Sequence, residues 1–269
     1  MCFQAKGNMR RSALILSIQK TNVEYYLDYL KRVDKDLPIL QDVFPKLPAR
    51  DEDVIEFHTK LCSVMKDNNY RFKGIKVTPL SNETVRSLHG TKPICVPVFS
   101  NFFQDKTFSK NQCRLQYVEP AICFKIGDIS NPSALGKCVS YFPAIEVVGT
   151  RFPFYPPSIS GFACDLCSSV GFSVGTENKL TSSSTKTLPG YHFVLLHDDD
   201  PIQVGCLNLS SDDPLQLINL AHTYASKIGC PLQEGHFILC SGVSPRTPAK
   251  VGDYTIQWGA FGTATCTIV

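Results

Sequence analysis

The chain has 269 residues, of which 43% are hydrophobic and 19% are charged. This composition is typical of a globular protein with one large or two small domains, and it is too apolar for intrinsic disorder. The net charge is +3 and no Lys/Arg run exceeds two residues, which argues against a nucleic-acid-binding surface. No apolar stretch approaches the roughly 18 residues that a membrane span needs. Neither nucleic acid nor a membrane is therefore an expected partner.

The cysteines and the N-terminal charges bear on the cellular compartment. A chain of this length can bury a core without disulfides, and many of its 12 cysteines lie in apolar runs, as small buried hydrophobes do. Examples are Cys95, Cys123, Cys206, Cys240 and Cys266. We therefore expect reduced thiols and a cytoplasmic protein. The alternative is a mitochondrial protein, because the first twenty residues contain basic side chains and no acidic one.

Residues 1–90 are expected to form a helical N-terminal region. Thr21 and Glu24 have the spacing of a capping box, and apolar residues follow them at helical intervals. A second helix is predicted to begin near Asp51, with apolar residues on one face. A short third helix is predicted to end before Gly90.

From residue 91 onward, short β-branched or aromatic runs alternate with Gly, Pro, Asn and Ser, which is typical of strands. The predicted strands are Ile94–Phe99, Ala121–Ile126, Ala144–Val148, His192–Leu196 and Phe237–Cys240. Residues 91–269 are therefore expected to form one continuous β-rich body that follows the helical region.

Three further features complete this body. One helix is predicted with Asp213 as its N-cap, Pro214 at its first position and Gly229 after its last turn. The chain is expected to close with a turn near residues 250–253 and a final hairpin. The segment 175–189 is predicted to be a long polar loop without an element of its own, either a lid or an exposed connection.

Several familiar motifs are absent or incomplete. Cys164 and Cys167 form a CxxC pair, but no second pair exists to complete a four-thiolate zinc site. His197 and the three aspartates that follow it are expected to form a solvated turn between strands. No GxSxG, GxGxxG or P-loop motif occurs, which argues against serine hydrolases, dinucleotide enzymes and P-loop proteins.

Three acidic residues lie in or beside apolar strands: Glu119, Glu146 and Asp165. A carboxylate in such a strand must be paired or bind a cation, because its desolvation is otherwise costly. The residues by themselves leave two interpretations open, a site for a hard cation and ordinary salt bridges or exposed strand faces.

Five segments from about Phe57 to the C-terminus follow one another in the order of a known family. They are Gly74–Val77 with Ser81, Val118–Ala121 with Ile126 and Gly127, Pro143–Val148, Asp165 with Ser168 and Ser169, and Asp213–Leu232 with Ser241 and Gly242. On these segments the chain resembles the 2-keto-4-pentenoate hydratase and 4-oxalocrotonate decarboxylase branch of the fumarylacetoacetate hydrolase superfamily.

The resemblance implies an α+β fold, in which a helical N-terminal region accompanies a mostly antiparallel, distorted β-roll, and it implies a homo-oligomer. It also implies Mg²⁺ or Mn²⁺ held by three carboxylates, with the metal chelating a small 2-keto acid substrate. A hard divalent ion prefers oxygen ligands, polarises the keto oxygen and stabilises the developing enolate.

Matched residue by residue, Glu119 and Glu146 fall on metal-ligand positions, whereas Lys76 and Asp165 fall on catalytic positions. Three serines fall on substrate-binding positions, namely Ser81, Ser168 and Ser241. The alternative roles are structural: Lys76 as a surface lysine next to a turn, and Asp165 as a strand-end cap.

The sequence departs from the family pattern at the metal. The third ligand position holds Ala121, and Gly149 and Leu166 replace other characteristic residues. Two hypotheses follow. The chain is either a metal-dependent hydratase or decarboxylase of a 2-keto acid, or a degenerate, non-catalytic relative that serves as a structural or binding subunit of a larger assembly.

Overall fold

The computed structural model describes most of the chain beyond residue 49. The described ranges are 50–79, 82–102, 106–111, 114–128, 130, 138–151, 158–181, 192–206 and 214–269. The helix expected after Thr21 and the N-cap expected at Asp213 lie outside them.

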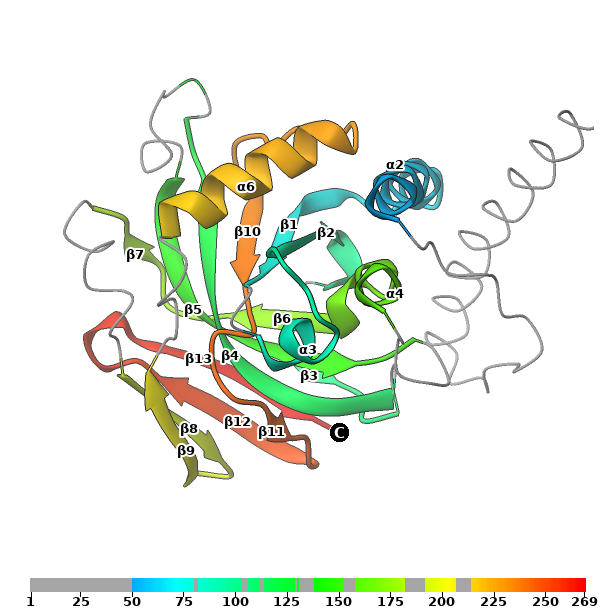
Figure 1. The fold of residues 1–269 in the computed structure, drawn as a ribbon. Helices are drawn as coiled ribbons and strands as arrows, with labels where there is room; N and C mark the ends of the chain where they lie inside the picture. The colour runs from blue at the N-terminus through cyan, green and yellow to red at the C-terminus, as the bar shows by residue number, and fades with distance from the viewer. Residues whose placement is uncertain are drawn as a thin grey trace, which may run out of the picture.

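Two sheets form the body of the described chain (Figure 1). The eight-stranded sheet has the order β2-β1-β10-β4-β5-β6, with β11 beside β4 and β7 beside β5. Its strands are β1 Phe72–Thr78, β2 Ile94–Phe99, β4 Leu115–Ile126, β5 Cys138–Gly149, β6 Ser169–Val174, β7 Asn178–Lys179, β10 Phe237–Cys240 and β11 Thr247–Pro248. The smaller sheet has the order β3-β13-β12-β8-β9. Its strands are β3 Thr107–Phe108, β8 His192–His197, β9 Asp200–Cys206, β12 Gly252–Gln257 and β13 Thr263–Ile268.

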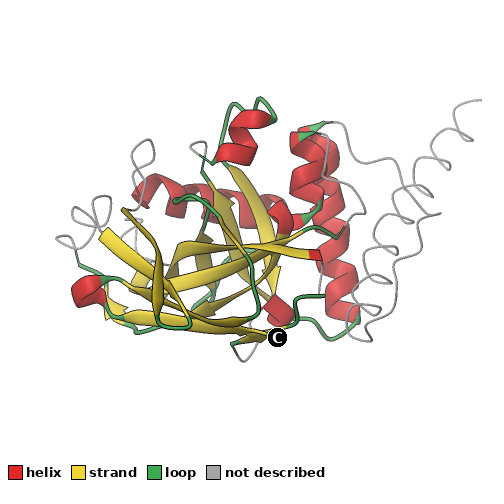
Figure 2. Cartoon of the chain, turned by 90° about the horizontal axis from the view of Figure 1, so that it is seen from below, coloured by secondary structure: helices red, strands yellow, loops and turns green. Residues whose placement is uncertain are grey.

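The pairing is antiparallel except between β1 and β10 and between β3 and β13. Strand β13 crosses β5 and β6, so the two sheets pack on each other. Figure 2 shows the longer helices behind the strands and to their right. The predicted α+β fold with a mostly antiparallel, curled sheet is confirmed.

Four α-helices are described: α2 Asp51–Asp67, α3 Glu83–Ser87, α4 Ile159–Cys164 and α6 Pro214–Lys227. Helix α2 begins where its acidic first turn predicts. Asn82 caps α3, because its side-chain oxygen accepts the backbone N–H groups of Thr84 and Val85. Gly229 follows α6 with a φ of +73°, the left-handed conformation that glycine adopts without strain. None of these helices is long and apolar enough to cross a membrane.

The structure differs from the expected organisation in several places. Residues 72–78, expected in the helical region, form β1 in the large sheet, because β1 pairs with β10 from the far end of the chain. The segment 175–189 includes the short strand β7. Of the cysteines expected to be buried, Cys206 is exposed, because it lies on the edge strand β9. All described cysteines are free thiols, as predicted.

His58 ties α2 to the other helices. Its Nε2 donates to the carbonyl oxygen of Ala163 at 3.0 Å, so Nδ1 accepts from the Tyr224 hydroxyl at 2.6 Å. The ring is fully buried, and this burial lowers the pKa of His58 to about 4. The imidazole is therefore neutral in the folded chain at neutral pH.

We expect this histidine to make the fold acid-labile. Between pH 6.5 and 4 the unfolded chain binds a proton at His58 that the folded chain excludes, so stability is present above pH 6.5 and is lost as the pH falls toward 4. The loss should total roughly 3 kcal/mol, at about 1.4 kcal/mol per pH unit. Urea unfolding across this range measures the slope. The His58→Gln variant should flatten it, and an unchanged slope would contradict the assignment.

Candidate functional site

Two glutamates face each other at the centre of the large sheet. Glu119 on β4 is the direct register partner of Glu146 on β5, and Ala121 is opposite Ala144. Side chains two residues apart on a strand share a face, so Ala121 lies beside Glu119. Glu119 is 2% exposed and Glu146 is fully buried. The antiparallel register therefore brings together the two predicted metal ligands and the alanine that replaces the third.

Lys76 neutralises Glu146. Its Nζ lies 2.7 Å from Oε1 of Glu146 and donates a second bond of 3.0 Å to the carbonyl oxygen of Cys167. Ser169 Oγ also donates to Oε1 of Glu146. The other oxygen, Oε2, is buried and has no hydrogen-bond partner among the described residues. The lysine predicted to be catalytic is thus buried and ion-paired, and the surface alternative is wrong for Lys76.

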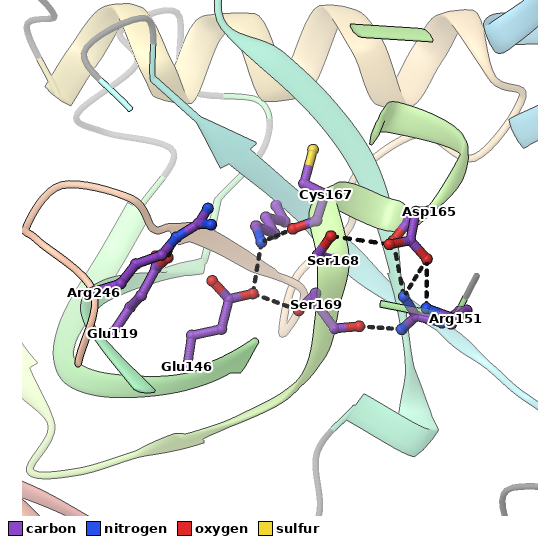
Figure 3. Close-up of polar contacts among 9 residues, drawn as sticks. Glu119, Glu146, Arg151, Asp165, Cys167, Ser168, Ser169 and Arg246 are labelled. Atoms are coloured by element: carbon purple, nitrogen blue, oxygen red, sulfur yellow. Dashed lines mark hydrogen bonds and ion pairs between the residues drawn. The ribbon is translucent and has the colours of Figure 1, made fainter. Parts of the chain in front are cut away.

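Arg246 neutralises Glu119. The arginine lies in the connection between β10 and β11, and its Nε is 2.5 Å from Oε1 of Glu119. The guanidinium also stacks on Tyr117, 5.7 Å from the ring centroid. Desolvation raises the pKa of Glu119, and the charge of Arg246 opposes that rise. Figure 3 shows Arg246 directly over Glu119, with Glu146 beside the pair.

A third ion pair, between Arg151 and Asp165, is also buried. Asp165, after α4, accepts the backbone N–H of Arg151 at 3.0 Å and the Ser168 hydroxyl at 2.9 Å. The Arg151 guanidinium donates to the Asp165 carbonyl oxygen at 2.8 Å. Burial raises the pKa of Asp165, and Arg151 lowers it. Asp165 and Ser168, predicted as catalytic and substrate-binding residues, therefore hold a turn in place in this structure.

That turn orients the lysine. Leu166, Cys167 and Ser168 have φ values of 51°, 51° and 55°, a left-handed run that non-glycine residues adopt only under constraint. The run points the Cys167 carbonyl oxygen at Nζ of Lys76. Figure 3 shows Cys167 between Glu146 and the Asp165–Arg151 pair. The strained turn thus connects the Lys76–Glu146 and Asp165–Arg151 pairs.

Of the remaining predicted serines, the structure describes Ser241, whose hydroxyl makes no hydrogen bond to the described part of this network. Ser81 lies outside the described residues. Ser241 is buried after β10, and its backbone N–H donates to Val77 at 3.3 Å. Its hydroxyl has no hydrogen-bond partner among the described residues.

The charges of the central site balance without a metal ion. Glu119 and Glu146 supply two negative charges, and Lys76 and Arg246 supply two positive charges. The arrangement implied by the sequence resemblance is three carboxylates, one lysine and a divalent cation, which is also neutral. Compared with that arrangement, this chain has Ala121 in place of one carboxylate and has the guanidinium of Arg246 beside Glu119. Together these two differences add two positive charges, which equal the charge of a divalent ion.

The donor set does not fit a divalent metal. No group of three or more His, Cys, Asp or Glu side chains in the described part of the chain is arranged to hold one. Oε1 of Glu119 and Oε1 of Glu146 each pair with a cationic side chain, and an added divalent ion would place excess positive charge in a buried site. Sequence reasoning missed Arg246. The available signal was an arginine five residues after Ser241, between two short segments, Ser241–Gly242 and Gly252–Asp253, that resemble the family.

Comparison with known proteins shows the family of the chain. No protein-family model matches it. REH2-associated factor 2 from Trypanosoma brucei brucei (strain 927/4 GUTat10.1) is 39% identical over 258 residues, which cover 94% of this chain and 97% of the relative. The chain belongs to the family of REH2-associated factor 2.

The REH2-associated factor 2 family shares its fold with a decarboxylase. The 4-oxalocrotonate decarboxylase from Pseudomonas putida G7, complexed with magnesium and adipate, superposes with a TM-score of 0.72 at 15% identity over 94% of this chain and 97% of the enzyme. Its complex with calcium and acetate gives 0.69 at 15% identity over 93% and 98%. A 4-oxalocrotonate decarboxylase from Pseudomonas sp is 24% identical over 140 residues, which cover 50% of this chain and 53% of the enzyme. The predicted resemblance to the fumarylacetoacetate hydrolase superfamily is confirmed at the level of the fold.

Proposed function

We propose that this chain is a non-catalytic member of the superfamily that serves as a protein-binding subunit of an assembly containing REH2. The observation that carries the proposal is the buried contact between Arg246 and Glu119. It occupies one of the two retained metal-ligand carboxylates, while Ala121 removes the third.

The candidate acid and base groups of this site are not arranged as metal-dependent lyase chemistry requires. In such an enzyme a divalent ion polarises the keto oxygen of the substrate, and an acid or base of suitable pKa moves the proton. Here Lys76 is held by Glu146 and by a carbonyl oxygen, both at hydrogen-bond distance. Asp165 is held by Arg151 and Ser168. These groups stabilise one another, as the residues of a structural network do.

Support for a protein partner comes from the relative at 39% identity, whose name describes a factor associated with REH2. Coverage of 97% of that relative means that the two chains correspond over nearly their whole length. A fold does not determine a reaction, so kinship with a decarboxylase is compatible with a binding role.

Two measurements on the purified full chain test the proposal. The first is calorimetric titration with Mg²⁺ or Mn²⁺, alone and with oxalate, followed by an assay for turnover of 2-keto acids. The second is binding of the chain to REH2 from the same organism. We expect no heat of metal binding at millimolar concentration, no turnover, and saturable binding of REH2.

Either half of the proposal can fail separately. Metal-dependent turnover of a 2-keto acid would overturn the non-catalytic role and restore the lyase hypothesis. Absence of REH2 binding would overturn the assembly role.

A further inference from the structure

Strand β9 forms the outer edge of the smaller sheet. It is the last strand in the order β3-β13-β12-β8-β9, and no described strand pairs with its other side. Figure 1 shows β8 and β9 at the margin of the molecule, away from the helices. An unpaired edge presents a row of backbone N–H and C=O groups that another strand can join.

The side chains of β9 alternate between a face that is hydrogen-bonded to the body and a face that is exposed. Gln203 faces the body, where its side chain donates to Pro245 at 3.1 Å and accepts from Thr247 at 2.8 Å. Val204 is 72% exposed and Ile202 is 42% exposed, and Cys206 is exposed on the same face. The strand is thus tied to the body on one face and offers apolar side chains on the other.

The part of this edge from Ile202 to Cys206 lacks the usual protection against pairing, whereas Asp200 and Pro201 protect the start of the strand. Natural edge strands commonly carry lysine or an inward-pointing charge, whereas no charged residue lies between Pro201 and Cys206. Val204 is in register with the half-buried Val194 of β8, which extends the apolar surface onto the next strand. Exposed apolar side chains that gather at one place are a mark of interaction sites.

The turn before β9 adds a charge. Asp198, Asp199 and Asp200 are all exposed. Asp198 accepts the backbone N–H of Asp253 at 2.8 Å, whereas the carboxylates of Asp199 and Asp200 have no hydrogen-bond or ion-pair partner among the described residues. The edge therefore has an apolar length and an acidic end.

From these features we infer that β9 is the docking edge for an extended segment of the protein partner. That segment adds as a strand beside β9, carries apolar side chains at alternate positions, and has a lysine or arginine next to Asp199 and Asp200. Backbone hydrogen bonds supply affinity in this mode, and the alternate side chains and the charge supply specificity. The inference rests on the proposed function, because it names the surface by which the chain binds REH2.

The test compares REH2 binding by the full chain and by three variants, using biolayer interferometry at two salt concentrations. Ile202→Lys/Val204→Lys places charge on the apolar face and should weaken binding at least about tenfold. Asp199→Asn/Asp200→Asn keeps residues that tolerate the turn and should abolish the salt dependence of association. Val139→Lys is the control, because Val139 is a 46% exposed valine on β5 of the other sheet, and it should bind as the natural chain does.

Thermal unfolding of each variant checks that the fold is intact, and hydrogen exchange of residues 200–206 checks that β9 is protected in the complex. If Ile202→Lys/Val204→Lys binds REH2 as strongly as the natural chain does, β9 is not the docking edge, and the proposed function is unaffected. A natural chain that does not bind REH2 would overturn both. If light scattering finds self-association that Ile202→Lys/Val204→Lys abolishes, a second copy covers β9 and the inference is wrong.

Discussion

The variant Ala121→Glu/Arg246→Gln is expected to bind Mg²⁺ or Mn²⁺, whereas we expect no binding by the natural chain. The two substitutions add a carboxylate beside Glu119 and remove the guanidinium that covers it. They leave three carboxylates against Lys76, a net charge of minus two that a divalent ion neutralises. Oxygen ligands are the kind that these hard ions prefer.

Calorimetric titration measures metal binding by the double variant, and the two single variants show whether both substitutions are needed. Ala121→Glu alone retains Arg246 over Glu119, and Arg246→Gln alone lacks the third ligand. Each should bind at least on the order of 100-fold more weakly than the double variant, because a missing ligand costs more than the 10–100-fold of an outer-shell change. Ala121→Glu/Arg246→Lys is the matched control, since it keeps the positive charge and should not bind.

Two outcomes would contradict the assignment of Arg246 to the cation position. One is metal binding by the natural chain. The other is a folded double variant, verified by its thermal unfolding, that still binds no metal.

The second large effect is expected at Lys76. The Lys76→Met variant should lower the free energy of unfolding by about 3–5 kcal/mol, because it leaves Glu146 charged, buried and without its cation. Replacing both partners in Lys76→Met/Glu146→Leu should recover most of that loss, since apolar side chains can replace a buried ion pair at little cost. Urea unfolding at pH 7 measures both.

Lys125→Met serves as the control for this series. Lys125 on β4 pairs with Glu177 at 3.5 Å, but the two side chains are 37% and 52% exposed. Loss of such a surface pair should cost about 1 kcal/mol or less. A Lys76→Met variant as stable as Lys125→Met would mean that the buried pair contributes nothing, and the structural role given to Lys76 would be wrong.

Local patterns predicted the elements that depend on local chemistry. The apolar run at residues 237–240 is strand β10, and the acidic residues after Arg50 begin helix α2. Strand β1 was harder to predict, because its pairing with β10 joins residues about 160 positions apart. No pattern within the first ninety residues can report such a partner.

The candidate site was likewise predictable in part from the sequence and in part only from the structure. Acidic residues in apolar strands indicated that Glu119 and Glu146 had to be paired or bound to a cation. Whether Glu119 is ion-paired or bound to a cation depended on Arg246, which lies 127 residues from Glu119 along the chain. The connection after β10 brings it there only in the folded protein.

The sequence by itself determined the α+β class and the positions of Lys76, Glu119, Glu146 and Ala121, because these follow from local motifs whose order along the chain resembles that of a known family. Only the tertiary structure decided what neutralises the carboxylates. Electrostatic pairing acts over a few ångströms in space, and the guanidinium of Arg246 reaches Glu119 from a loop that is distant in the sequence. The tertiary structure also decided that β9 is an edge strand. It is one because no other strand in the described fold pairs with its outer side.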